Sequence, residues 1–219
     1  MARRRVAILI SGRGSNMAAL VAAAKALDYP AEIALVLSNR PHAKGLATAQ
    51  AAGLAVATID HVPFGKDREA FERALQDELD AHRIDLICLA GFMRLFTPGF
   101  VERWQGRMLN VHPAVLPAFK GLDTHARALA AGVRIHGATV HFVIPEMDAG
   151  PVIAQGALAV RDDDTAETLA ARVLAIEHKI YPAALRLVAE GRVRVENGRC
   201  RIDAVPASDG VLLAPPLES

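Results

Sequence analysis

Near its beginning the chain reads Val6-Ala7-Ile8-Leu9-Ile10-Ser11-Gly12-Arg13-Gly14-Ser15-Asn16, an apolar run that passes into a glycine-rich turn. The run predicts a core strand over Val6–Ser11, and the turn predicts the start of a helix over Met17–Leu27. The first amides of such a helix, with the positive end of its dipole, can hold a phosphate. The spacing favours a monophosphate, because the third glycine of a dinucleotide fingerprint and a Gly-Lys-Ser/Thr loop are both missing. The alternative is an ordinary glycine turn in which Asn16 caps the helix.

Strand-like and helix-like segments continue to alternate after this turn. We expect strands over Glu32–Ser38, Ala55–Ile59 and Leu86–Ala90, and helices over Ala43–Ala52 and Asp67–His82. The strands are largely apolar on both faces and are separated by helices, which is typical of a parallel sheet with right-handed crossovers. Ligands of such sheets bind beyond the carboxyl ends of the strands.

The second half of the chain is less regular. The predicted elements are, in order, helix Pro98–Trp104, strand Met108–Val111, helix Thr124–Ala131, strand Ala138–Val143, strand Val152–Val160 and a helix from Thr165 to about Glu190. No helix separates the last two strands, so the loop Ile144–Pro151 joins neighbours and one strand runs antiparallel. Asp164 with Glu167 predicts a capping box for the last helix, and Pro182 predicts a bend in it.

Together these elements predict a three-layer α/β fold of Rossmann-like type. It has a mostly parallel, twisted sheet of about seven strands, helices on both faces and one antiparallel strand late in the sheet. We expect residues 1–190 to form a single catalytic domain. Residues 191–219 are expected to add a small hairpin at Asn197-Gly198 and a tail that frays at Ala214-Pro215-Pro216, both belonging to the same domain.

Composition narrows the partners and the compartment. The 219 residues include 25 basic and 24 acidic ones, so no broad field exists to hold a nucleic acid or an anionic membrane. No apolar stretch approaches the roughly 20 residues that span a bilayer, and the run after Arg3-Arg4-Arg5 is broken too early to be a secretory signal. Cys88 and Cys200 show no disulfide or zinc pattern. We therefore expect a cytoplasmic protein that binds small molecules.

A second polar stretch, Leu109-Asn110-Val111-His112-Pro113, stands at the end of an apolar strand. Residues two apart on an extended chain face the same way, so Asn110 and His112 can point at one reacting atom. Asp148 can stabilise the protonated imidazole of His112, which then acts as a general acid. The Asn110 amide can donate to a developing oxyanion. This set fits acyl transfer through a tetrahedral intermediate. The alternatives are a capped strand end with a satisfied buried histidine, and a simple Asx turn at Asp148.

Other groups give weaker indications. His136 and His141 flank a strand, but neither His-Glu-x-x-His nor clustered cysteines accompany them, so no metal is expected. The absence of a Gly-x-Ser-x-Gly elbow and the position of Cys88 within a strand argue against a serine or cysteine triad. The strand exit Gly91–Phe96 carries large apolar groups that either line a slot for a flat ligand or pack in the core. Glu177 would ordinarily lie on a solvated helix face, as would Arg68.

Four stretches match one known family in order and in spacing. They are Ser11–Asn16, Leu89–Arg94, Leu109–Pro117 and His141–Ile153. From about Arg5 to Glu190 the chain closely resembles phosphoribosylglycinamide formyltransferases. The resemblance implies transfer of a formyl group from the cosubstrate 10-formyltetrahydrofolate to the amine of 5-phosphoribosylglycinamide in de novo purine biosynthesis. It implies direct attack through a tetrahedral intermediate, with no metal and no covalent enzyme intermediate, and leaves open a monomer or a homodimer.

The resemblance also implies roles for individual residues. His112 would be the general acid, Asn110 the oxyanion stabiliser, and Asp148 the group that orients His112 and relays protons. The ribonucleotide's ribose hydroxyls would be held by Glu177, and its phosphate by Gly14, Ser15 and Asn16. The residues expected to contact the folate are Arg68, Met93, Arg94, Leu95, Phe96, Asn110, Ile144, Pro145, Glu146, Met147 and Asp148.

Three positions depart from the family pattern. Arg13 replaces asparagine, Leu174 replaces glutamine and Asp123 replaces histidine. Leu174 matters most, because a polar contact to the sugar is lost there. Arg13 either adds charge near the phosphate or points to solvent.

Rival functions predict different sequences. A formyltetrahydrofolate hydrolase has an extra N-terminal regulatory domain and a histidine after the motif histidine, whereas here Pro113 follows His112 and we expect the chain to start at the first strand. A methionyl-tRNA formyltransferase would need a further C-terminal domain and a basic surface. A non-catalytic nucleotide-binding module would keep the Gly-Ser-Asn loop but has no use for the Asn-His-Asp set.

Overall fold

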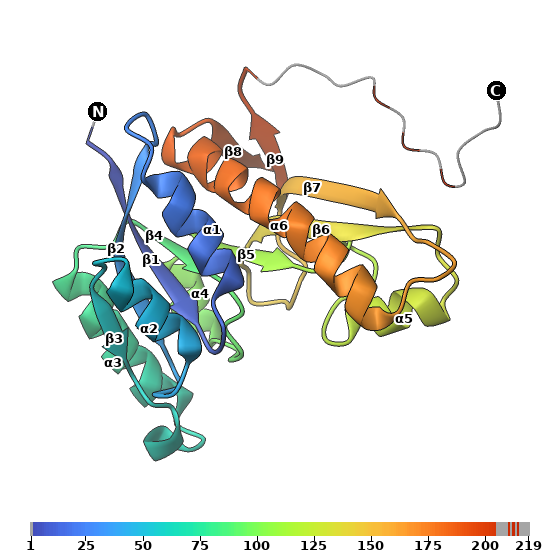
Figure 1. Ribbon diagram of the computed structural model, residues 1–219. Coiled ribbons are helices and arrows are strands. Elements are labelled where there is room, and N and C mark those ends of the chain that lie inside the picture. The colour runs from blue at the N-terminus through green and yellow to red at the C-terminus, as the bar shows by residue number, and fades with distance from the viewer. Residues whose placement is uncertain (1, 205–209, 211, 213, 215–219) are drawn as a thin grey trace.

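The computed structural model describes residues 2–204, 210, 212 and 214, and its centre is a seven-stranded sheet (Figure 1). The strand order is β3-β2-β1-β4-β5-β6-β7. The strands are β1 (Arg4–Ile10), β2 (Ala31–Ser38), β3 (Val56–Thr58), β4 (Leu86–Leu89), β5 (Met108–His112), β6 (Ile135–Phe142) and β7 (Val152–Ala159). The first five strands are parallel, and β6 runs antiparallel to both of its neighbours. The predicted sheet, with one antiparallel strand late in it, is confirmed.

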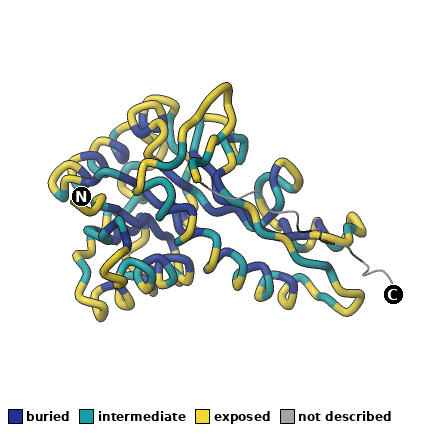
Figure 2. Tube along the Cα trace, turned by 90° about the horizontal axis from the view of Figure 1, so that it is seen from above, coloured by how far each residue is buried: buried dark blue, intermediate teal, exposed yellow. Residues whose placement is uncertain are grey.

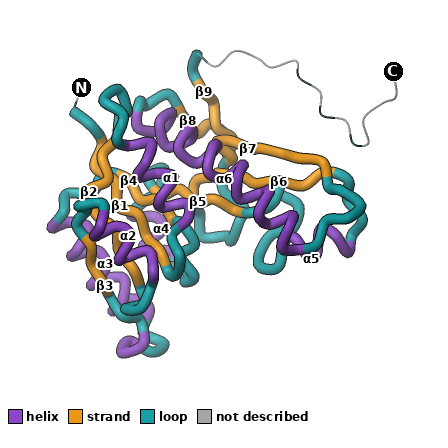
Figure 3. Tube along the Cα trace, in the orientation of Figure 1, coloured by secondary structure: helices purple, strands orange, loops and turns teal. Residues whose placement is uncertain are grey.

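Helices cover both faces of this sheet (Figure 3). One face carries α1 (Ser15–Ala24), α2 (Lys44–Ala51) and the long α6 (Ala166–Ala189), and the other carries α3 (Arg68–Ala81) and α4 (Pro98–Arg103). A short α5 (Thr124–Ala130) contacts α6, and a 3-10 turn, η1, covers Val62–Phe64. The small hairpin of β8 (Val193–Glu196) and β9 (Arg199–Ile202) turns at Asn197-Gly198, as predicted.

The core is split into two halves by the sheet. Along β1, Val6, Ile8 and Ile10 face α1 and α6, while Ala7 and Leu9 face α3 and α4. This alternation follows from the two-residue period of a strand. Because both faces are covered, β1 is apolar and buried from Val6 to Ile10, and Figure 2 shows the buried segments concentrated in the middle of the molecule.

The order in which the chain adds strands to the sheet reverses beside β1. The chain passes from β1 outward to β2 and β3, then returns to place β4 and β5 on the other side of β1. Such a switch point leaves a crevice at the carboxyl ends of the two central strands, where α/β proteins bind ligands. Here these ends belong to β1 and β4, and the Ser11 N–H donates to the Gly91 carbonyl across them at 3.1 Å.

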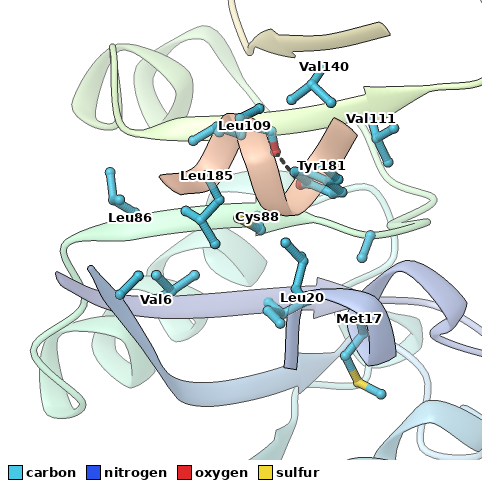
Figure 4. Close-up of a cluster of buried hydrophobic side chains, with 14 of the residues drawn as sticks. Val6, Met17, Leu20, Leu86, Cys88, Leu109, Val111, Val140, Tyr181 and Leu185 are labelled. Carbon is cyan, nitrogen blue, oxygen red and sulfur yellow. Dashed lines mark hydrogen bonds between the residues drawn. The ribbon is translucent and has the colours of Figure 1, made fainter. Parts of the chain in front are cut away.

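A tyrosine of α6 supports the neighbouring pair of strands. Figure 4 shows Tyr181 reaching into the core toward Leu109. Its hydroxyl donates to the carbonyl oxygens of Leu89 in β4 and Leu109 in β5, at 3.0 and 3.2 Å. The ladder between these strands ends at the pair Leu89–Asn110, so Tyr181 supplies a hydrogen bond where the two backbones separate.

Several local predictions are corrected by the structure. The helix expected from Met17 starts at Ser15, because Gly14, with φ 74°, takes the N-cap position. Strand β6 begins at Ile135, three residues early, because Gly137 lies against the Gly156 backbone of β7, where a Cβ would stand 1.9 Å from the Gly156 carbonyl oxygen. That close approach is visible only once β7 is in place.

The cap of α6 also differs from the prediction. Thr165 is the N-cap, and its reciprocal partner is Thr168 rather than Glu167. Asp164 lies one residue outside the helix, where it accepts hydrogen bonds from the Arg161 N–H and the Arg172 guanidinium. Pro182 lies within α6, and the bend there stays a prediction. The predicted fraying at Ala214-Pro215-Pro216 concerns residues that, after Ala214, are outside the described part of the chain.

Candidate active site

The imidazole and carboxylate predicted to act together do meet. His112 ends β5, and Asp148 lies in the loop between β6 and β7. The His112 Nδ1 atom lies 3.3 Å from Asp148 Oδ2, and the two side chains are only 7% and 10% exposed. The other ring nitrogen, Nε2, donates to the Phe119 carbonyl at 3.0 Å. Nδ1 is therefore the nitrogen that is free to exchange a proton beside the carboxylate.

The loop that carries Asp148 is held in a strained conformation. Asp148 has φ 52°, and Phe119, which binds the other side of His112, has φ 54°. Left-handed backbone of this kind is uncommon for residues other than glycine and clusters at functional sites. Asp148 Oδ2 also accepts the Gly121 N–H at 2.9 Å. One carboxylate thus ties His112 to the loop that follows β5, and the simple Asx-turn alternative does not describe it.

Asn110 has a partner that the sequence did not identify. It pairs with His141 across β5 and β6, and its Nδ2 atom lies 3.3 Å from His141 Nε2. Burial lowers the pKa of His141, and its Nδ1–H donates to the Phe142 carbonyl at 2.9 Å. A neutral ring with Nδ1 protonated presents Nε2 as an acceptor, so the Asn110 amide donates to it. Sequence alone suggested only a metal ligand at His141, because the cross-strand register was unknown.

The glycine-rich turn is built to leave amides free. Gly14 caps α1 without any side-chain hydrogen bond, so the first-turn N–H groups, including those of Ser15 and Asn16, have no acceptor within the helix. Gly45 of α2 supports the turn by donating its N–H to the Gly12 carbonyl at 3.0 Å. A Cβ at Gly45 would lie 2.5 Å from Ile10 Cδ1, so the close approach requires glycine. Arg13 is exposed on this turn.

Glu177 belongs to this part of the site. It is 7% exposed, not solvated as its helix position suggested, and its Oε2 accepts from Asn16 Nδ2 at 2.6 Å. Asn16 is not the cap of α1, because Gly14 takes the N-cap position and no side chain caps the helix. Burial raises the pKa of Glu177, while the Asn16 hydrogen bond and the nearby His178 and His112 act in the opposite direction. The Asn16 Oδ1 atom is buried and has no partner among the described residues, which leaves it as an acceptor for a ligand hydroxyl.

A cavity of about 630 Å³ lies beside the switch point. Its lining residues are Gly65, Lys66, Arg68, Met93, Arg94 and Leu95. Met93 and Leu95 are 61% and 58% exposed, so the core-packing alternative is wrong for them. It is right for Phe96, which stacks between Phe92 and Phe100. Apolar side chains beside three cationic ones suit a flat ligand with an anionic end.

The other segment predicted to contact folate does not line this cavity. Within residues 144–148, Glu146 Oε1 instead lies 3.0 Å from Lys120 Nζ, beside the Asp148 contact with Gly121. The structure therefore joins Arg68 with Met93, Arg94 and Leu95, and joins 144–148 with the loop after β5. Lys66 is a cavity residue that sequence reasoning missed, since a lone lysine in a loop has no distinguishing pattern.

Two further histidines, His125 and His136, lie against each other. Their rings pack edge to face at 5.3 Å, and burial lowers the pKa of both, that of His136 to about 4. Cys88 is buried within β4, and burial raises the pKa of its thiol to about 12. Within the described residues, no group of three or more His, Cys, Asp or Glu side chains is arranged to hold a metal ion. The same residues contain no helix long and apolar enough to cross a membrane.

An α/β sheet with an amide and an imidazole at one strand end, a carboxylate from a neighbouring loop and no activated nucleophile among them defines a class of site that can promote direct attack on an acyl carbon. A family model described as formyl transferase matches residues 4–185, and the chain belongs to that family. The resemblance stated from the sequence is thereby confirmed.

Individual relatives narrow the family further. The chain is 41% identical to the phosphoribosylglycinamide formyltransferase of Escherichia coli K12, covering 90% of this chain and 93% of that protein. It is 48% identical to the trifunctional purine biosynthetic protein adenosine-3 of Bos taurus, but spans only 20% of that relative's length. The crystal structure of glycinamide ribonucleotide transformylase 1 from Symbiobacterium toebii superposes with a TM-score of 0.88 at 44% identity, covering 91% of this chain and 94% of that one.

Proposed function

We propose that this chain transfers the formyl group of 10-formyltetrahydrofolate to the amine of 5-phosphoribosylglycinamide in purine biosynthesis. The observation that carries the proposal is the position of His112 and Asp148. They form a buried pair at the end of β5, and His112 is near enough to the Asn16–Glu177 pair to influence the pKa of Glu177. A transfer reaction needs its acid and base close to the acceptor substrate.

The ribonucleotide binds at the glycine-rich turn. Its phosphate accepts from the first-turn amides of α1 at Gly14, Ser15 and Asn16, where the helix dipole also favours an anion. Its ribose hydroxyls meet Glu177 and the unpaired Oδ1 atom of Asn16. Leu174 lies on α6, the helix that also carries Glu177, about two turns before Tyr181. It is half-buried and supplies no polar group. We infer that Glu177 and Asn16 carry the sugar contacts without a glutamine at that position.

The folate lies in the cavity lined by Met93, Leu95 and the cationic side chains. Ile144–Asp148 does not line that cavity and contacts the end of the folate that carries the formyl group, beside Asp148. The amine nitrogen attacks the formyl carbon, and the carbonyl oxygen becomes an alkoxide that the Asn110 amide stabilises. The bond from carbon to the folate N10 atom then breaks as His112 Nδ1–H delivers a proton to that nitrogen. The proton lost by the amine passes to Asp148 or, through it, back to His112.

The competing reaction is hydrolysis of the same donor by water. A hydrolase would not need the phosphate-binding amides or the Asn16–Glu177 pair, both of which are assembled here. The test mixes the protein with 10-formyltetrahydrofolate, with and without 5-phosphoribosylglycinamide, and identifies the formylated product. We expect formylation of the amine and little free formate. Formate release that ignores the ribonucleotide would establish the hydrolase instead.

The remaining expectations concern the setting of the enzyme. We propose that it acts in the cytoplasm on small molecules without a metal, as a monomer or a homodimer. We also propose that residues 1–190 and the C-terminal hairpin form one domain, since Val193 and Cys200 pack against the core cluster of β1 and α6. Light scattering of the purified protein checks the oligomeric state. Truncation before Arg192 checks whether the hairpin is needed for folding.

A further inference from the structure

A buried hydroxyl lies between the glycine-rich turn and the cavity. Ser11 directly follows β1 and is 5% exposed. Its Oγ atom accepts from the Met93 N–H at 2.8 Å and donates its own proton to Asn39 Oδ1 at 2.6 Å. The backbone N–H of Ser11 donates to Gly91. Although Ser11 begins the phosphate-binding motif, the hydrogen bonds of its side chain therefore point toward the cavity side.

The same hydrogen-bonded chain reaches a second part of the cavity wall. Asn39 follows β2 and is 1% exposed. Its backbone carbonyl accepts from His61 Nδ1–H at 2.8 Å and from the His61 N–H at 3.3 Å. His61 is the N-cap of η1, and the residues that follow η1 are Gly65 and Lys66, which line the cavity. Ser11 and Asn39 thus connect the Met93 wall with the Lys66 wall.

The Met93 wall depends on side-chain contacts, because residues 92–97 belong to no strand or helix. The rings of Phe92 and Phe96 stack on each other, whereas the side chains of Met93 and Leu95 are mostly in solvent, so packing does not determine the positions of Met93 and Leu95. Two side chains accept hydrogen bonds from backbone N–H groups of this segment, Ser11 from Met93 and Glu72 from Thr97, where the Thr97 N–H donates to Glu72 Oε1 at 2.6 Å. Loss of the first hydrogen bond loosens the backbone between the Phe92 and Phe96 rings, which is the part that lines the cavity.

We propose that Ser11 and Asn39 are positioning residues for the folate cosubstrate. Their hydrogen bond sets the separation of the two cavity walls and thereby the affinity for folate, without touching either substrate. The inference rests on the proposed function and adds to it two residues outside the predicted folate contacts. The ribonucleotide site is unaffected, because its contacts at Gly14–Asn16 and Glu177 do not involve the Ser11 hydroxyl.

The test begins with Ser11→Ala. The substitution leaves the part-buried Met93 N–H and the buried Asn39 Oδ1 without their Ser11 partner, and we expect tetrahydrofolate binding to weaken by about tenfold in calorimetric titration. We expect the Michaelis constant for 5-phosphoribosylglycinamide to change less than about twofold. Hydrogen exchange of the Met93 amide should become faster, and this readout does not depend on activity.

Ser38→Ala is the matched control. Ser38 is a fully buried serine one residue before Asn39, and its hydroxyl exchanges hydrogen bonds only with the backbone of Arg40, at 2.9 and 3.0 Å. Like Ser11→Ala, the Ser38→Ala substitution removes a buried, hydrogen-bonded hydroxyl, but Ser38 does not contact the cavity-lining residues. We expect wild-type affinity for tetrahydrofolate in Ser38→Ala, even where its stability falls.

Asn39→Ala distinguishes a role in positioning the cavity walls from a general loss of stability. The backbone carbonyl that holds His61 remains in this variant. Because the His61 Nδ1–H donates to that carbonyl, Nδ1 cannot accept from Asn39 Nδ2, which lies 3.4 Å away, so among the described residues the Asn39 side chain acts through Ser11. The double variant Ser11→Ala/Asn39→Ala should therefore bind tetrahydrofolate about as weakly as Ser11→Ala alone. Losses that simply add would show two unrelated structural effects and would overturn the proposal.

The outcomes remain distinct if a variant or the proposed function fails. Should Ser11→Ala not fold, Ser11→Cys keeps the volume with a poorer acceptor and should show the same changes to a smaller degree. Folded Ser11→Ala with wild-type affinity for tetrahydrofolate overturns the inference. A wild-type protein that binds no tetrahydrofolate overturns the proposed function, and the cosubstrate role of Ser11 with it. In that case exchange at Met93 still shows whether Ser11 supports the cavity wall.

Discussion

Replacing Tyr181 by phenylalanine removes a single oxygen atom from the centre of the molecule. The ring is fully buried, so no large cavity forms, and the loss is confined to the hydroxyl proton shared between the Leu89 and Leu109 carbonyls. A buried acceptor left without its donor costs about 1–3 kcal/mol. We expect the free energy of unfolding to fall by about 2 kcal/mol. Turnover should also fall, because the Leu109 carbonyl precedes Asn110 directly.

Urea unfolding followed by the fluorescence of Trp104, the one tryptophan of the chain, measures this change. Tyr29→Phe is the comparison, because Tyr29 donates one hydrogen bond to the Pro182 carbonyl, at 2.7 Å, on the outer side of α6. It should lose about 1 kcal/mol and keep full turnover.

The difference in the free energy of unfolding between Tyr181→Phe and the wild type should not change with pH below about 9. Burial raises the pKa of Tyr181 well above its ordinary value, so the hydroxyl stays protonated in the folded protein. Its contribution is complete below the ordinary tyrosine pKa of about 10 and declines only above it. A loss under about 0.5 kcal/mol, which is the scatter of surface substitutions, would refute the assignment of Tyr181 as the support of β4 and β5.

Three further outcomes follow from the site. Asp148→Asn and His112→Ala should each lower turnover at least a hundredfold while the affinity for tetrahydrofolate changes little, because these groups act on the transition state, and near-normal turnover would exclude the residue concerned. Glu177→Ala should raise the Michaelis constant for the ribonucleotide about tenfold, and an unchanged constant would remove Glu177 from the sugar site. Burial lowers the pKa of His136 from 6.5 to about 4. As the pH falls, the unfolded chain therefore binds a proton at this histidine before the folded protein does. The free energy of unfolding should decrease by about 2–3 kcal/mol between pH 6.5 and pH 4. Urea midpoints of His136→Gln should decline less over this range, and parallel declines would contradict the reasoning.

The candidate catalytic residues were accessible to sequence reasoning because their signals are local. Asn110 and His112 are two apart on one strand, so their common direction follows from backbone geometry alone. The turn at Gly14 and the hairpin at Asn197-Gly198 are similar cases, since glycine's conformational freedom acts within a few residues. The alternation of apolar segments was enough to establish a parallel sheet and its ligand-binding edge.

The partners of these residues depended on the tertiary structure. Asn16 meets Glu177 across 161 positions of sequence, and Asn110 meets His141 only through the antiparallel register of β5 and β6. Local patterns offered a helix cap as the alternative for Asn16 and identified no partner for His141. Both gaps have the same cause, because a polar side chain bonds to whatever the packed elements bring beside it.

Sequence by itself determined which segments are strands and helices, where the chain turns, and which groups can do chemistry. These properties arise from backbone preferences and from the spacing of apolar residues. The tertiary structure alone decided that Tyr181 supports β4 and β5, that Ser11 reaches Met93, and that Asp148 ties His112 to Gly121. Burial of the apolar faces brings distant backbones together, and the hydrogen bonds that remain unpaired at those junctions select their partners from three-dimensional neighbours.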